Sequence, residues 1–237
     1  MRPIQKPDIG SIIDKTITIK ETYKPYQTAK EPLIHSIGQY CSFCERPIPF
    51  VSLEVEHIQA KSIAKYKHLE FLWINFLLAC KNCNLAKAAI DVIFDEIYLP
   101  HLNNTFLIFC IKEGGLITIN PNIQDPDKIA KTQKLIDLLG LDRVAGHSKR
   151  TRADDRWQGR HKAWNLATRF LEKHQQQQTD VETIVELCKS DGFWSIWMTV
   201  FQNYPEVKKA LITETIGTAT NCFDHNFNAI NRNGSEI

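Results

Sequence analysis

Four cysteines stand in two short pairs, Cys41-x-x-Cys44 and Cys80-x-x-Cys83. Four thiolates in two such turns are the usual ligands of a tetrahedral structural zinc ion. The surrounding sequences, CSFCERP and CKNCN, are typical of polar turns, which disfavours the alternative of four unligated thiols in a core. Four thiolates leave no open coordination position. We therefore expect this Zn²⁺ to stabilise the fold and not to catalyse a reaction.

The segment between the two pairs holds a second set of residues with chemical potential. Glu56 and His57 are adjacent, Asn75 follows them, and Asn84 comes directly after the last cysteine. The Glu56 carboxylate and the Asn84 carbonyl oxygen can bind Mg²⁺ or another hard divalent cation and leave positions open for phosphate and water. His57 suits a general base, because an ordinary histidine has a pKa of roughly 6.5. Asn75 can orient the imidazole by a hydrogen bond.

Each of these residues also has an ordinary structural interpretation. A histidine at a strand end is commonly solvated, and an asparagine is a common N-cap of a helix or of a turn. Lys87, one helical turn after Asn84, taken alone is a solvated helix residue. Their order, and their position between two cysteine pairs, favour metal-assisted phosphodiester cleavage over these separate roles.

The surrounding pattern predicts the elements that hold these residues. FVSLEVEHI alternates apolar and polar residues and predicts a strand ending near His57. LWINFLLAC is apolar and predicts a buried segment, and a helix is expected to begin near Asn82 to Asn84. NTFLIFCIKEGGLITINPN predicts a hairpin, and the pattern is helical from Asp125 onward, with a helix stop at Gly140.

These residues together resemble the HNH nuclease motif, a ββα-metal fold. The resemblance covers about residues 38–92 and rests on Cys41-x-x-Cys44, EVEHI and WINFLLACKNCNLAK. It implies that Glu56 binds the catalytic metal, His57 is the general base, Asn75 positions it, and Asn84 completes the metal site. Many family members also carry the two cysteine pairs. The chain departs from the common pattern at Ala60, Asn84 and Ala88, where many members have Pro, His and Gly.

A wider resemblance extends over most of the chain. MRPIQK, EGG, RADDRWQGRHKAW, GFWSIWMTVF and CFD are similar to the PtuB family, the HNH effectors of Septu and retron-linked antiphage systems. The resemblance implies a partner, a PtuA-like ABC-type ATPase, and a toxicity that the complex restrains until infection.

A basic segment runs from Arg143 to Lys162, with seven Lys or Arg residues against two acidic ones. Arg152, Arg156 and Arg160 recur every four residues, which predicts one helix face suited to phosphate. Lys87 is a further candidate for contact with nucleic acid. The alternatives are a solvated face paired with the neighbouring aspartates, or a contact with a partner protein. Trp157 and Trp164 lie on a neighbouring apolar face of the same helix, and the apolar residues of GFWSIWMTVF are expected to form a core stripe.

Bulk properties exclude few functions. The 237 residues carry a net charge of +2, so any basic surface must be local. No apolar run reaches the ~20 residues that span a bilayer, and we expect a cytoplasmic protein with no membrane contact. The fold class is α+β: an HNH region with an N-terminal extension and hairpin over 1–124, and an α-helical region over 125–237.

The leading hypothesis is therefore a metal-dependent endonuclease that acts on nucleic acid. The alternatives are a zinc-stabilised binding module for nucleic acid or protein without nuclease activity, and an HNH nuclease outside defence. The sequence leaves open whether the substrate is DNA or RNA, which metal is used, and the stoichiometry with an ATPase.

Overall fold

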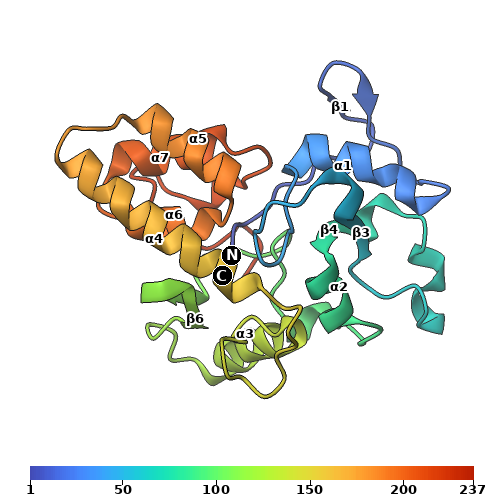
Figure 1. The fold of residues 1–237 in the computed structure, drawn as a ribbon. Coiled ribbons are helices and arrows are strands. Elements are labelled where there is room, and N and C mark those ends of the chain that lie inside the picture. Colours follow the sequence, from blue (N-terminus) through green and yellow to red (C-terminus); the bar gives the residue numbers. More distant parts are fainter.

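A computed structural model describes residues 1–237 as a mixed α+β chain (Figure 1). Its strands form three separate antiparallel pairs. The pairs are β1 (Ile12–Ile13) with β2 (Ile17–Thr18), β3 (Leu53–His57) with β4 (Phe76–Cys80), and β5 (Phe109–Lys112) with β6 (Leu116–Ile119). The α-helices are α1 (Lys30–Ile37), α2 (Lys81–Lys87), α3 (Pro126–Leu139), α4 (Arg156–Gln175), α5 (Val181–Asp191), α6 (Trp194–Val200) and α7 (Pro205–Glu214).

The β3–β4 hairpin and α2 form the unit that the spacing of the motifs predicts. The register pairs Leu53 with Cys80 and His57 with Phe76, so the last residue of β3 faces the first residue of β4. All five residues of β4 are buried, as its unbroken apolar sequence predicts. Helix α2 begins directly after Cys80. It ends at Lys87, because Ala88 has a positive φ of 47°.

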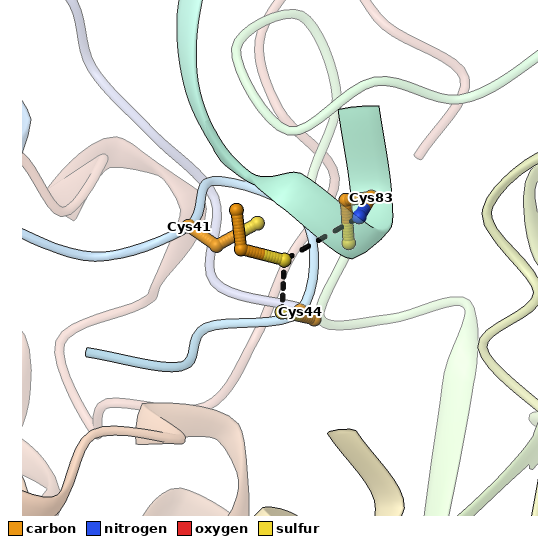
Figure 2. A group of neighbouring side chains, drawn as sticks. Cys41, Cys44 and Cys83 are labelled. Atoms are coloured by element: carbon orange, nitrogen blue, oxygen red, sulfur yellow. Dashed lines mark hydrogen bonds between the residues drawn. The ribbon is translucent and has the colours of Figure 1, made fainter. Parts of the chain in front are cut away.

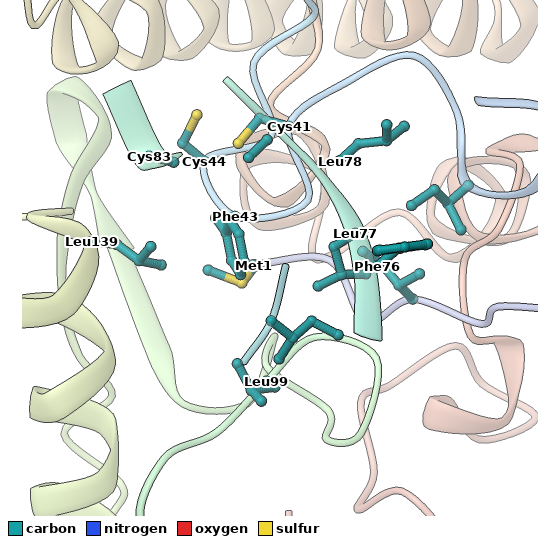
Figure 3. Close-up of a cluster of buried hydrophobic side chains, with 14 of the residues drawn as sticks. Met1, Cys41, Phe43, Cys44, Phe76, Leu77, Leu78, Cys83, Leu99 and Leu139 are labelled. Atoms are coloured by element: carbon teal, nitrogen blue, oxygen red, sulfur yellow. The ribbon is translucent and has the colours of Figure 1, made fainter. Parts of the chain in front are cut away.

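Two hydrophobic clusters stabilise the chain. The larger has 33 buried residues and surrounds the β3–β4 hairpin, the cysteines and α3 (Figure 3). The smaller has 18 buried residues, nearly all of them from α4 to the segment after α7. In Figure 1, α4 to α7 gather on the opposite side of the molecule from α2, β3 and β4. Helix α3 thus packs with the hairpin region, although it lies within the C-terminal half of the chain.

The predicted hairpin at Glu113–Gly115 is confirmed, with β5 and β6 on either side. The predicted helix stop at Gly140 is also confirmed, because this residue adopts the left-handed conformation with φ of 59°. The apolar residues of GFWSIWMTVF are buried as expected: Phe193, Trp194, Trp197 and Phe201.

The prediction for α4 was wrong in one respect. Its buried face consists of Arg156, Arg160, Ala163 and Ala167, whereas Trp157 and Trp164 are only partly buried. Helical periodicity correctly places these arginines on one face. Both arginines are nevertheless buried, because carbonyl groups of other elements accept hydrogen bonds from them there.

None of the helices combines the length and apolarity that crossing a bilayer needs.

Candidate metal centre and active site

The four cysteines of the two pairs converge on one point. They are all buried, and their sulfur atoms lie within 4.8 Å of one another. The Sγ atoms of Cys44 and Cys80 are 3.7 Å apart. Figure 2 shows Cys41, Cys44 and Cys83 gathered around the same point. A tetrahedral zinc ion with Zn–S bonds of about 2.3 Å requires a sulfur separation of about 3.8 Å. The four side chains therefore fit a structural zinc ion.

Two donors outside this ligand set support negative charge on the sulfurs. The backbone N–H of Cys83 donates to the Sγ atom of Cys80 at 3.4 Å. The guanidinium of Arg156 donates to the Sγ atom of Cys83 at 3.3 Å, and Asp154 holds that guanidinium from its other edge at 2.6 and 2.8 Å. Sequence reasoning missed this contact, since α4 lies more than 70 residues after α2.

Two of the three arginines proposed to contact nucleic acid are internal. Arg156 is 2% exposed and also donates to the carbonyls of Leu139 and Gly140 at the end of α3. Arg160 is 3% exposed and donates to the carbonyls of Gly115 and Leu141. Both side chains satisfy buried carbonyl groups, so they cannot form a surface ridge for phosphate.

Arg152 differs from the other two arginines. It is exposed, and it precedes α4, which begins at Arg156. The three arginines therefore do not line a single helix face, and only Arg152 is exposed for contact with a phosphate.

The acidic residues of β3 face α2. Side chains alternate along a strand, so Glu54 and Glu56 lie on one side of the hairpin. Asn84 donates its amide N–H to the Glu54 carboxylate, and Lys87 bonds to Oε1 of Glu56 at 2.8 Å. Two carboxylates of the strand thus meet two polar side chains one helical turn apart.

Lys87 is an internal partner and not a surface cation. Its side chain is 3% exposed and that of Glu56 is 4% exposed. The ammonium also donates to the carbonyl oxygen of His57 at 2.8 Å. Burial raises the pKa of Glu56, and the neighbouring Lys87 opposes that rise. The prediction that Lys87 binds nucleic acid was wrong, because Lys87 is buried and its ammonium links α2 to β3 through Glu56 and the carbonyl of His57.

His57 lies at the end of β3, with its ring on the other side of the strand. The imidazole packs edge-on against Tyr26 and Phe76, with ring centroids 4.7 and 5.2 Å away. Its Nε2 atom is 2.9 Å from the carbonyl oxygen of Glu70. A carbonyl can only accept, so the hydrogen belongs on Nε2 and Nδ1 is left as the proton acceptor. Burial lowers the pKa of His57, which favours the neutral ring that a base requires.

Asn75 does not contact the imidazole, contrary to the expected hydrogen bond. Its Oδ1 accepts from the backbone N–H of Gln59 at 2.8 Å, and its Nδ2 donates to the carbonyl of Gln59 at 2.9 Å. The same amide lies 3.4 Å from the carbonyl of Leu69, next to the Glu70 carbonyl that holds His57. Asn75 therefore fixes the chain on both sides of the histidine, and its influence on the ring is indirect.

The sequence analysis did not include Glu54 among the site residues. The strand pattern could have indicated it, because residues two apart in a strand share a face, and Glu54 precedes Glu56 by two. Glu54 contacts Asn84, which the resemblance assigns to the metal site. The Tyr26 and Glu70 contacts to His57 had no such signal, since both arise from segments distant in the sequence.

The donor set on the α2 side suits a hard divalent cation. Glu54 and Glu56 offer carboxylate oxygens, and Asn84 offers a carbonyl oxygen while its N–H group is engaged with Glu54. Lys87 occupies one oxygen of Glu56 and leaves the other oxygen as a possible ligand.

Comparison with known protein families finds a match for the segment that carries these site residues. Residues 41–89 match the family model described as HNH endonuclease. The matched segment runs from the first cysteine through β3 and β4 and ends just past α2. A comparison with curated proteins gives no match. The family match and the cysteine cluster support the HNH family and, as a general class, a metal-dependent nuclease that acts on nucleic acid.

Proposed function

We propose that this chain is a metal-dependent HNH endonuclease that hydrolyses phosphodiester bonds in DNA or RNA. One observation carries the proposal. Within the segment that matches the family model, the imidazole of His57 with a free nitrogen and the carboxylate of Glu56 stand at adjacent positions of β3, and Asn84 of α2 contacts the same strand. A general base and an oxygen-rich cation site are the two components that water attack on a phosphodiester requires.

In the proposed reaction, His57 accepts a proton from the attacking water at Nδ1. The Glu70 carbonyl keeps the ring in that tautomer, and Asn75 keeps the Glu70 and Gln59 segments in place. Glu56 and Asn84 would hold a divalent cation such as Mg²⁺, with Glu54 supporting Asn84. When bound, such a cation polarises the phosphate and stabilises the leaving oxygen.

We further propose that the nuclease is the toxic effector of an antiphage defence complex with a PtuA-like ABC-type ATPase, in the cytoplasm. The support for this is the sequence similarity to PtuB effectors that extends beyond the HNH segment. A site whose base and carboxylates are already held by the chain also agrees with an enzyme that needs restraint by a partner.

The test is a cleavage assay on end-labelled DNA and on cellular RNA in Mg²⁺. The purified chain is assayed alone and with the ATPase encoded beside it, and the His57→Ala variant is assayed in parallel. Zinc content is measured in every preparation, because the variant removes the base and should leave the cysteine cluster intact.

Cleavage by the wild-type chain that is lost in the variant is the expected result, and the cleaved polymer identifies the substrate. Cleavage that persists at the same rate in the zinc-loaded variant would place the active site elsewhere. A folded, zinc-loaded protein that cleaves neither polymer, with or without the ATPase, would favour a binding module without nuclease activity.

A further inference from the structure

A cavity of about 360 Å³ lies outside the proposed active site, between the first cysteine pair and helices α5 to α7. Tyr40 and Pro47 line it on the side of the cysteine turn, and Phe193 and Trp194 line it at the start of α6. Its size falls in the range of sites for small molecules, and its walls are mainly apolar.

Three buried polar atoms around this cavity have no hydrogen-bond partner in the chain. They are Nε of Arg2, the hydroxyl oxygen of Tyr40 and the hydroxyl oxygen of Thr215. Buried polar groups are almost always paired, and an unpaired one costs free energy. Three such groups around one cavity indicate that an occupant with hydrogen-bond acceptors belongs there.

Arg2 is the central group, because its side chain is charged and the residue is only 1% exposed. Its guanidinium makes three hydrogen bonds, to the carbonyls of Ile216 and Ile37 and to the hydroxyl of Thr218, at 2.8, 2.7 and 2.9 Å. A guanidinium has five N–H donors, so Nε–H and one further N–H remain free. All three present partners are neutral oxygens.

The nearby Glu45 does not neutralise this guanidinium through a direct contact. Its carboxylate accepts from the backbone N–H groups of Arg2 and Ser195 and from the Ser195 hydroxyl. The Arg2 side chain instead lies over the ring of Tyr40, 4.2 Å from the centroid. A buried cation without an anionic hydrogen-bond partner is costly, and a bound anion would remove that cost.

We propose that this cavity binds a carboxylate attached to an apolar group. The free N–H donors of Arg2 suit a carboxylate, and the hydroxyls of Tyr40 and Thr215 can donate to its remaining lone pairs. Phe193 and Trp194 then pack against the apolar body. Arg2 and Lys189 line the cavity together with Glu45 and Glu214, so the wall carries no net positive charge, which favours a monoanion over a doubly charged phosphate.

Two sources can supply this chemistry: a small free carboxylic acid, or the C-terminal carboxylate of a peptide that ends in an apolar residue. In either case the occupant would touch both the cysteine turn and α6. These two segments are already joined by a hydrogen bond from the N–H of Phe193 to the carbonyl of Glu45, at 2.9 Å. Binding would therefore stabilise the contact between the matched segment and the helical region.

The test measures binding and thermal unfolding of the full-length, zinc-loaded chain. The small-molecule arm uses phenylacetate and indole-3-acetate against their amides. The peptide arm uses a hexapeptide ending in phenylalanine, as the free acid and as the C-terminal amide. We expect one acid probe to raise the Tm by several degrees at saturation and its amide to bind at least tenfold more weakly.

The variants Tyr40→Phe and Thr215→Val isolate the cavity hydroxyls. Because neither hydroxyl has a partner in the chain, removing it should leave the Tm without ligand unchanged or slightly higher. Each variant should weaken binding of the acid roughly tenfold. Ile216→Trp, at a 60% exposed residue on the cavity wall, should obstruct entry without disturbing the core.

Two results would overturn the proposal. In one, no acid probe binds or raises the Tm of the wild-type chain. In the other, acid and amide bind equally and the three variants leave binding unchanged, which would show that the probe binds elsewhere. Both readouts are independent of cleavage, so they do not depend on the proposed nuclease activity.

Discussion

The cysteine cluster and the acidic site of β3 belong to the same β3–β4–α2 unit, but they are held in different ways. The four sulfurs meet one another, and the one side chain outside the cluster that donates a hydrogen bond to them is Arg156, so an ion is expected to organise them. The acidic and histidine side chains are each held by the chain: Glu54 by Asn84, Glu56 by Lys87, and His57 by the Glu70 carbonyl.

This difference separates a site that needs its metal to fold from a site that the fold prepares in advance. A cluster of thiolates without an ion brings like charges together, so the zinc ion that fits this cluster would be part of the fold. The proposed active site instead keeps its groups in position through neutral and charge-assisted hydrogen bonds. Substitutions in the two regions should therefore fail in different ways.

The largest expected effect comes from Cys80→Ser. Losing one thiolate should abolish tight zinc binding and destabilise the folded chain by more than about 4 kcal/mol. Zinc content and the Tm by circular dichroism measure both effects. Cys110→Ser is the matched control, because Cys110 is half-buried and lies outside the cluster. Equal stability of the two variants would contradict an organising role for zinc.

His57→Ala should have the next largest effect, and it should act on activity. Removing the base should lower cleavage roughly 10²- to 10⁴-fold while zinc content stays at one ion per chain. The matched control is His68→Ala, because His68 is exposed and lies in the connector between β3 and β4 that follows His57. If both variants lose activity equally, His57 has no special role.

Lys87→Met should show that the acidic site depends on a cation of the chain. Glu56 would be left buried without its partner, which should cost about 3–5 kcal/mol of folding free energy. The double variant Glu56→Gln/Lys87→Met should recover most of that loss, since no charge is then stranded. Urea unfolding of the single and double variants gives the coupling energy. Additive losses would mean that the ion pair contributes nothing as a pair.

The smallest effect is expected at the edge of the cysteine cluster. The double variant Arg156→Met/Asp154→Asn removes the N–H donor to Cys83 without stranding the buried Asp154 carboxylate, and should weaken zinc affinity about 10- to 100-fold in a chelator competition. Arg152→Met should leave zinc affinity unchanged, because Arg152 is exposed and donates to none of the cysteine sulfurs. The same Arg152 variant should lower the salt dependence of nucleic-acid binding by about one unit of slope if it contacts phosphate. If the Arg156 double variant instead kept its zinc affinity and lost salt dependence of nucleic-acid binding, Arg156 would have to be a surface residue that contacts phosphate.

The sequence allowed the local features of this hairpin to be predicted, because each depends on residues close in the chain. Cys-x-x-Cys turns, an alternating strand and a glycine helix stop all follow from spacing over a few residues. The same spacing argument would have found Glu54, which shares a strand face with Glu56.

Contacts between distant segments could not be predicted in this way. Helical periodicity correctly places Arg156 and Arg160 on one face of α4. The carbonyl oxygens that accept their hydrogen bonds, however, belong to α3 and to the β5–β6 turn. The sequence alone therefore predicts exposed arginines at positions where the fold provides buried hydrogen-bond acceptors. Asn75 and Glu70 position His57 through the connector between β3 and β4, whose path no local pattern specifies.

The most direct test of the account is anomalous diffraction from zinc-loaded crystals soaked in Mn²⁺. We expect a zinc peak among the four cysteine sulfurs. We also expect a separate manganese peak on the α2 side of the hairpin, bound by an oxygen of Glu56 and the carbonyl oxygen of Asn84. Manganese found only elsewhere, with β3 and α2 well ordered, would contradict the assignment of the catalytic metal site.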